Sequence, residues 1–204
     1  MNGKEIRFLE AFEEQARRVE EAGRILRQVT EGEAAAGKGW AQIRELASRT
    51  QAACPALYEK MVRAFRERPE IETARRLLLA AETLMREAEE LAARFALYGP
   101  AETDGLHVMA ELVQHALHEL ARMAAYGRTL SDDYLKAEAR AQRIRNYEAR
   151  GAECLLSSLR PLTAADNCLL EALRQAPLYE GMRRMLRTAA DCAAFYGETV
   201  QGLL

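Results

Sequence analysis

The segment RRLLLAAETLMREAEELAARF, residues 75–95, decides the fold class. Its apolar side chains recur at intervals of three and four residues and place Leu78, Met85 and Leu91 on one side, which predicts a long amphipathic helix. The segment also carries four acidic residues: Glu82, Glu87, Glu89 and Glu90. They could contribute to a carboxylate metal site or lie on the solvent face of the helix. Because they lie away from the leucine side, we expect a solvated face.

Similar helical periodicity covers the rest of the chain, and runs of alternating apolar and polar residues are nearly absent. In the first helical segment the apolar stripe consists of Leu9, Phe12, Ala16, Val19, Gly23 and Leu26. Six long amphipathic helices with short connections are expected. The predicted fold class is therefore all-α, with six long helices arranged as two three-helix bundles.

Glycine and proline mark the expected ends of the first three helices. A glycine-containing loop, EGEAAAGKG, follows the first helix, and the second is expected from about Trp40 with a kink at Pro55. Pro69 is expected at the first position of the third helix, where its missing N–H costs little. The stretch LYGP, residues 97–100, ends that helix.

The second half of the chain has comparable boundary signals. Thr103 or Asp104 is expected to cap the fourth helix, and Ser131 to open a fifth helix that runs to about Leu159. Pro177 is expected to break the last helical stretch.

The length of 204 residues suits a single all-helical domain, residues 1–204, with two pseudo-repeat halves at 1–100 and 101–204. The halves contain related segments, IRELASRTQAAC at 43–54 and IRNYEARGAEC at 144–154. This similarity supports a weak internal duplication.

Composition restricts the functional classes. The chain has 29 basic and 31 acidic side chains and a net charge of -2, which argues against nucleic acid as the main partner. It has no apolar run long enough to span a bilayer and no signal-peptide core at its start, so we expect a cytoplasmic protein. The cysteines are widely spaced and are expected to be buried free thiols: Cys54, Cys154, Cys168 and Cys192.

Three stretches carry a family resemblance: FLEAFEEQARRVEEAGRIL at 8–26, ARRLLLAAETLMREAEELAARFALY at 74–98, and TAADCAAFYGETV at 188–200. Their order and spacing resemble the PhoU-like regulators of phosphate transport, in particular the group that accompanies Pit-type phosphate transporters. The resemblance implies two three-helix bundles, a cytoplasmic position at the inner face of the membrane, and contact with a transporter. Many such proteins bind iron or other divalent metals through acidic E/D-x-x-x-D motifs.

The residues at the corresponding positions are mostly not carboxylates. In the first half, the positions that the resemblance assigns to metal ligands are Ala47, Gln51, Leu79, Ala80 and Thr83; in the second half they are Glu148, Ala152, Ala190, Ala193 and Ala194. A shift of one residue brings in Glu153 or Asp191 but does not restore a full set. The sequence therefore predicts no bound cofactor. The alternative is a bound iron or manganese ion, for which Glu148 and Asp191 are weak ligand candidates.

All three histidines lie in the expected fourth helix. His115 and His118, beside Glu111 and Glu119, are further weak metal candidates, but the H-E-x-x-H motif is absent. Helical spacing places an apolar face on Met109, Leu112, Ala116, Leu117 and Leu120, and a polar face with Glu111, His115, His118 and Arg122 roughly opposite. A solvated polar face is the favoured interpretation.

No nucleophile motif or phosphate-binding loop is found, so no enzyme activity is expected. All but four of the 29 basic residues are arginines, whose planar guanidinium binds carboxylates and phosphate. Ion pairing within the bundle accounts for most of them. The candidates for binding a partner or an anion are Arg75, Arg76, Arg183, Arg184 and Arg187.

These observations predict a non-enzymatic regulator or accessory protein of inorganic phosphate transport. It is expected to act by helix-face contact with a Pit-type phosphate transporter or another membrane transporter subunit. The alternatives are a helical bundle that binds a metal or small ligand, and a structural bundle that forms a homo-oligomer.

Overall fold

The computed structural model describes residues 2–99, 103–164 and 169–204, and helices account for nearly all of them. The elements are α1 Gly3–Thr30, α2 Ala36–Phe65, α3 Ile71–Tyr98, α4 Asp104–Ala125, the short 3₁₀ helix η1 Tyr126–Arg128, α5 Leu130–Ala164 and α6 Leu169–Gln201. No strand occurs within these ranges. The predicted all-α class with six long helices is confirmed.

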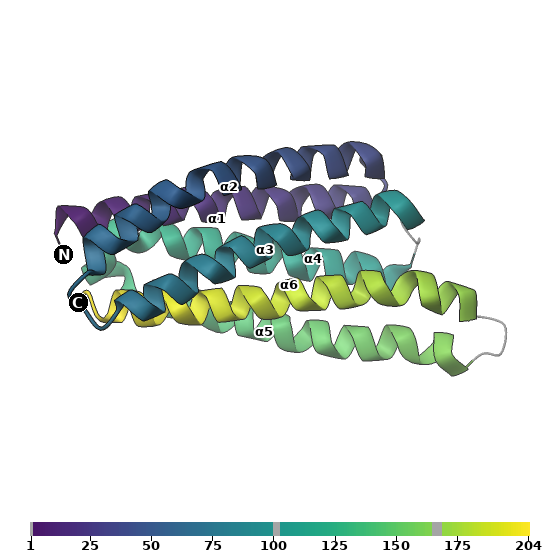
Figure 1. The fold of residues 1–204 in the computed structure, drawn as a ribbon. Coiled ribbons are helices and arrows are strands. Elements are labelled where there is room, and N and C mark those ends of the chain that lie inside the picture. The colour runs from purple at the N-terminus through teal and green to yellow at the C-terminus, as the bar shows by residue number, and fades with distance from the viewer. Residues whose placement is uncertain (1, 100–102, 165–168) are drawn as a thin grey trace.

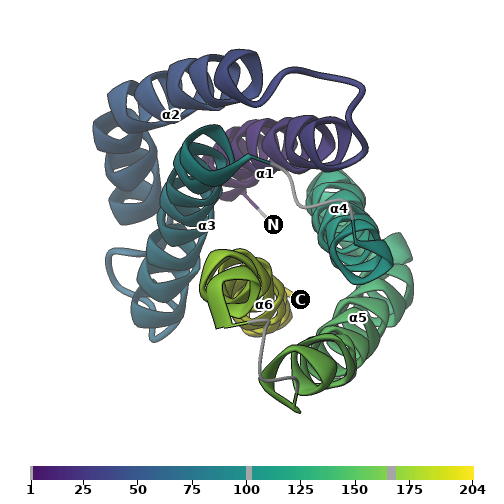
Figure 2. The ribbon, with the colours of Figure 1, turned by 90° about the vertical axis from the view of Figure 1, so that its right-hand side faces the viewer.

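The helices run roughly parallel or antiparallel to one long axis (Figure 1). Helices α1, α2 and α3 pack against one another, as do α4, α5 and α6, and the two groups meet where α1 packs on α4 and α3 packs on α6. Viewed along the axis, α2 and α5 lie at opposite corners of the molecule (Figure 2). Each of these outer helices packs mainly within its own half.

One continuous hydrophobic core joins the halves. All six apolar positions predicted for the first helix are buried. Phe8 meets Phe65 edge-on with ring centroids 5.2 Å apart, which ties α1 to the end of α2. Phe12 stacks on Tyr196 of α6 at 5.5 Å and thereby links the two halves. Such aromatic pairs contribute about 0.5–1.5 kcal/mol beyond the burial of their area.

Several helix starts differ from the predictions. Helix α2 begins at Ala36, four residues before Trp40, so the GKG stretch is helical. Helix α3 begins at Ile71, and Pro69 precedes it rather than occupying its first position. Its predicted end is confirmed: Gly99 caps it with a φ of 76°, a conformation that favours glycine.

The prolines do not divide the long helices. Pro55 lies inside α2, whose axis changes direction in the end-on view (Figure 2). The predicted break at Pro177 is wrong, because α6 is continuous through it. Arg94 of α3 donates a hydrogen bond to the Pro177 carbonyl at 3.0 Å, so tertiary contact supports the helix there. Helix α5 begins at Leu130, one residue before Ser131, and passes Leu159 to end at Ala164.

The two related segments occupy comparable positions. Ile43 in α2 and Ile144 in α5, their first residues, are both fully buried. Each segment ends in a half-buried thiol that donates to a backbone carbonyl: Cys54 to Thr50 and Cys154 to Gly105.

Two glycines near the start of α2 provide a matched stability test. A Cβ at Gly39 would lie 2.3 Å from Cγ2 of Val29, whose β-branched side chain is buried, whereas a Cβ at Gly37 would meet nothing within 4 Å. Gly39→Ala should lower the free energy of unfolding by about 1–3 kcal/mol through overpacking. Gly37→Ala should raise it by up to about 1 kcal/mol through helix propensity. Urea denaturation measures both, and equal effects of the two variants would contradict the close α1–α2 packing.

Candidate functional site

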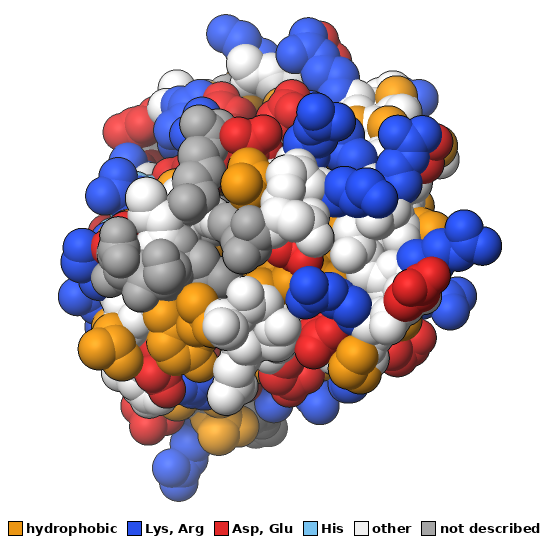
Figure 3. Space-filling model, turned by 90° about the vertical axis from the view of Figure 1, so that its left-hand side faces the viewer, with side chains coloured by type: hydrophobic (Ala, Val, Ile, Leu, Met, Phe, Trp, Pro, Cys, Tyr) orange, Lys and Arg blue, Asp and Glu red, His pale blue; other side chains and the backbone are white. Residues whose placement is uncertain are grey.

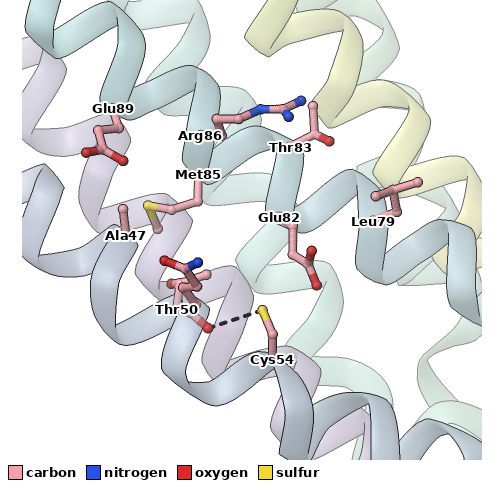
Figure 4. A pocket seen from close by; sticks show the side chains of 10 residues that line it. Ala47, Thr50, Cys54, Leu79, Glu82, Thr83, Met85, Arg86 and Glu89 are labelled. Carbon is pink, nitrogen blue, oxygen red and sulfur yellow. Dashed lines mark hydrogen bonds between the residues drawn. The ribbon is translucent and has the colours of Figure 1, made fainter.

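A groove of about 310 Å³ lies between α2 and α3 (Figure 4). Helix α2 contributes small and polar side chains, and α3 contributes two carboxylates together with apolar contacts. The lining residues are Ala47, Thr50, Gln51, Cys54, Leu79, Glu82, Thr83, Met85, Arg86 and Glu89. Of the four acidic residues expected on a solvated face, three are at least partly solvated, since Glu82 and Glu89 are half-buried and Glu90 is exposed.

This groove brings together positions that the family resemblance assigns to metal ligands. Ala47 and Gln51 of α2 face Leu79 and Thr83 of α3 across it. Alanine and leucine have no ligating atom, and hard divalent cations require several oxygen ligands, mainly carboxylates. These residues do not fit the family's metal, and among the residues described no group of three histidine, cysteine, aspartate or glutamate side chains could hold an ion.

Inside the groove, the Glu82 carboxylate acts on Cys54 and Tyr58 of α2. Desolvation by burial, followed by the interaction with Glu82, raises the pKa of the Cys54 thiol to about 11. The same two causes raise the pKa of Tyr58. The thiol also donates to the Thr50 carbonyl at 3.2 Å, the contact drawn in Figure 4. Cys54 is consequently a neutral thiol at physiological pH and a poor nucleophile.

Glu87 does not belong to the solvated face predicted for it. Glu87 is only 8% exposed and lies in the seam between α3 and α6. Desolvation raises its pKa, although hydrogen bonding to Thr188 and the charges of Arg184 and Arg86 act in the opposite direction. Arg184 approaches Glu87 at 3.9 Å and Glu90 at 3.7 Å.

In the second half, a smaller groove of about 130 Å³ lies mainly between α5 and α6. Ala193 and Ala194, two positions matched to ligands by the resemblance, line it beside Glu138 and Arg145. Glu148 is half-buried and Asp191 is exposed, and neither lines this groove.

The polar face of α4 is solvated as predicted, since Glu111, His115 and His118 are exposed and the opposite apolar face is buried. Nδ1 of His118 lies 2.6 Å from Glu20 of α1, and the His115 ring lies 5.8 Å from the Tyr147 ring. The two histidines thus contact different helices.

Glu119, in contrast, is 8% exposed and forms ion pairs with two arginines of α5. Arg140 approaches it at 2.6 Å and Arg143 at 3.3 Å. Arg140 also donates to the Tyr126 hydroxyl at 3.0 Å. This network holds α4, η1 and α5 together.

Many arginines pair within their own helix. Four pairs place glutamate one turn before arginine, the favourable orientation: Glu13–Arg17, Glu14–Arg18, Glu45–Arg49 and Glu59–Arg63. At one end of the molecule, Lys and Arg side chains gather toward the upper right of the view and are mixed with carboxylates (Figure 3). The nearly equal numbers of acidic and basic side chains allow ion pairing of this kind in an arginine-rich chain.

The five candidate partner-binding arginines have different environments. Arg76 lies over the Phe195 ring at 4.2 Å, and Arg184 pairs with Glu87 and Glu90. Arg75 is exposed and acts electrostatically on Tyr58. No ion pair to another described residue is found for Arg183 or Arg187, both on α6. Arg187 and Arg75 are exposed, whereas Arg183 is half-buried.

The prediction that the cysteines are buried holds only for Cys192. Cys54 and Cys154 are free but half-buried, and Cys168 lies outside the described residues. Thr50, Cys54 and Tyr58 were not identified as site residues from the sequence. Their spacing of four residues places them on one face of α2, but the sequence pattern does not show that Glu82 of α3 lies against that face.

Comparison with protein-family models gives no match, and comparison with curated proteins gives no significant match. Over the described ranges, no helix combines the length and the apolar character needed to cross a bilayer.

The state of Cys54 can be tested by alkylation. With a pKa of about 11, its thiolate fraction at pH 8 is roughly one in a thousand, so alkylation by iodoacetamide should be slow. Glu82→Gln removes the nearby negative charge, lowers the pKa and should accelerate modification of Cys54. Peptide mass spectrometry measures the rates, with Glu45→Gln on the exposed side of α2 as the control. An unchanged rate in Glu82→Gln would contradict the interaction.

The raised pKa of Glu87 leads to a specific pH dependence of the free energy of unfolding. A carboxyl whose pKa is raised in the folded state binds more protons there than in the unfolded state, so its contribution to stability falls as pH rises above the unfolded pKa. Glu87→Gln should therefore become more stable relative to the native chain as pH increases from 4 to 7. Urea denaturation at both pH values measures this difference, with Glu111→Gln, which removes an exposed carboxylate on α4, as the control. A relative stability that falls with rising pH would contradict the burial argument.

Proposed function

We propose that the protein is a non-enzymatic regulator or accessory of inorganic phosphate transport. It acts by direct contact with a Pit-type phosphate transporter, or another membrane transporter subunit, on the cytoplasmic side. The observation that carries the proposal is the convergence of Ala47, Gln51, Leu79 and Thr83 on one groove. The α2 and α3 positions of this set are about thirty residues apart in the sequence and line the same groove. The resemblance to the PhoU-like regulators implies such a meeting of the two helices.

The proposed contact does not depend on a metal cluster, because those four positions provide no carboxylate. It uses arginine on α6 instead. Arg183 and Arg187 lie one turn apart, and Arg187 is exposed. A pair of guanidinium groups at this spacing suits acidic side chains on a transporter loop.

Affinity purification tests the proposal. The tagged protein is recovered from detergent-solubilised native membranes of cells grown in high and in low phosphate, and associated proteins are identified by mass spectrometry. Recovery of a phosphate permease in amounts that change with phosphate supply is the expected result. Recovery of the protein alone under both conditions would overturn the proposal.

Charge reversal tests the contact residues. The double variant Arg183→Glu, Arg187→Glu should reduce permease recovery by about tenfold or more, equivalent to roughly 1.4 kcal/mol of binding free energy. Arg184 is left unchanged because a carboxylate there would face the buried Glu87. The matched control reverses Arg122 and Arg150, two exposed arginines elsewhere on the surface. Circular dichroism verifies folding, and equal recovery for both double variants would exclude the α6 pair.

A further inference from the structure

The outer side of α5 carries a stripe of exposed side chains. Helix α5 packs on α4, α6 and η1, and its opposite side faces away from the bundle in the end-on view (Figure 2). The α5 stripe follows alternating steps of four and three residues, which is the spacing of the a and d positions of a coiled-coil helix. It consists of Leu135, Ala139, Gln142, Asn146, Ala149 and Leu156, with Glu153 at the remaining position, and every one of these residues is exposed.

The α5 stripe is poor in charge for the solvent-facing side of a helix. Glu153 is its one charged residue, although 29% of the residues in the chain are charged. Leu135 and Leu156 mark its two ends, about 32 Å apart along the helix axis, and they are 76% and 70% exposed. The small side chains of Ala139 and Ala149 lie between them. These features suit contact with a second helix along the length of α5.

Cationic side chains border the stripe on both sides. Between its two leucines, the exposed charged residues outside the stripe are Lys136, Glu138, Arg143, Arg145 and Arg150. Cations therefore outnumber acids on the outer side of α5 even when Glu153 is included, in a chain whose net charge is -2.

Contacts within the protein leave much of this positive charge available. Arg143 shares the Glu119 carboxylate with Arg140, so that one acid serves two guanidinium groups, and the Arg143 side chain remains 58% exposed. Arg145 donates to the neutral side chain of Gln142. No ion pair to another described residue is found for Arg150.

The other outer helix, α2, has a different arrangement. Two of its exposed arginines, Arg49 and Arg63, pair with Glu45 and Glu59 one turn earlier in the same helix. Pro55 also lies within α2. Its outer cations thus have partners of their own, which distinguishes α2 from α5.

We propose that the α5 stripe docks an acidic amphipathic α-helix of a partner protein. Leu135 and Leu156 bury their side chains against apolar residues of that helix, and Ala139 and Ala149 allow its backbone to approach closely. Asn146, a polar residue near the middle of the stripe, favours one register of the pair. The bordering cations pair with carboxylates along the edges of the partner helix. This surface is separate from Arg183 and Arg187 of α6, so the inference stands apart from the proposed function.

The charge and polarity of the surface favour this occupant over two others. A second copy of the chain would bring its own cationic borders against these, and like charges across a helix pair are unfavourable. A lipid surface takes up helices with a continuous apolar side. Gln142, Asn146 and Glu153 interrupt the apolar character of this stripe. An acidic partner helix meets neither obstacle.

Fluorescence anisotropy of the full chain with synthetic peptides, at fixed ionic strength, tests the proposal. The acidic peptide has three heptads with leucine at the a and d positions, one asparagine at the central a position, and glutamate at the e and g positions. Repulsion between the glutamates keeps it from pairing with itself. The comparison peptide has lysine in place of glutamate. The acidic peptide is expected to bind about tenfold or more tightly than the lysine peptide.

Two double variants test the anchors and the charge separately. Leu135→Ser with Leu156→Ser should weaken binding of the acidic peptide by about tenfold or more, because both apolar contacts are lost. Arg145→Glu with Arg150→Glu should weaken it by a similar factor and strengthen binding of the lysine peptide, because the sign of the border is reversed.

The matched control reverses two exposed arginines elsewhere, Arg44 on α2 and Arg66 at its C-terminal end. Arg44→Glu with Arg66→Glu changes the net charge equally and should leave both affinities unchanged. Arg143 is not substituted, because a carboxylate there would face the buried Glu119. Circular dichroism verifies that each variant folds, and if one α5 variant fails to fold, the other carries the test.

Three results would overturn the proposal. The first is no binding of the acidic peptide, or equal binding of both peptides. The second is an equal loss of affinity in the α2 control, which would mean diffuse charge attraction. The third is a dimer of the native chain in sedimentation velocity that the leucine variant converts to a monomer, which would mean that a second copy covers the stripe. The α5 variants should recover the permease as the native chain does, so failure of this inference differs from failure of the proposed function.

Discussion

The mutual burial of α3 and α6, together with that of α1 and α4, is the constraint on which the other contacts depend. At both seams a glycine permits close approach: a Cβ at Gly23 would lie 2.7 Å from Leu117, and one at Gly181 would lie 2.9 Å from Leu91. Each leucine therefore occupies space that a side chain would otherwise take. Because α1 and α3 also pack on α2, and α4 and α6 on α5, closing these seams converts two three-helix groups into one core. Interiors packed in this way tolerate little change in volume.

With the four central helices packed against one another, the outer helices α2 and α5 expose a larger part of their surface to solvent. Helix α2 packs on α1 and α3, and α5 packs on α4 and α6, so each has a wide face without a helical neighbour. Both grooves described above border these outer helices. Binding at such grooves does not require the central seams to open. The residues that maintain the fold lie in the packed centre, whereas the groove-lining residues lie near the outer helices.

The sequence predicted the helices well because apolar periodicity depends on each helix alone. It predicted the surroundings of individual side chains less well, because these depend on how many helices a given helix contacts. Helix α3 packs against α1, α2 and α6, so its buried arc is wide enough to include Glu87. The continuity of α6 through Pro177 likewise does not follow from the local sequence, and Arg94 of α3 contacts the helix at this point. The groove positions were found from the family resemblance.

The two regions of interest share α3, and this has an electrostatic consequence. Glu82 and Glu89 face the groove with α2, while Glu87 lies in the seam with α6 and meets Arg184. Arg86, which borders the groove, already acts on Glu87, so the two regions are within electrostatic reach of each other. A positive charge placed in the groove favours ionisation of Glu87, because an opposite charge nearby stabilises a carboxylate. An ionised Glu87 holds Arg184 more strongly in the seam. A charge in the groove therefore also acts on the Glu87–Arg184 pair in the seam.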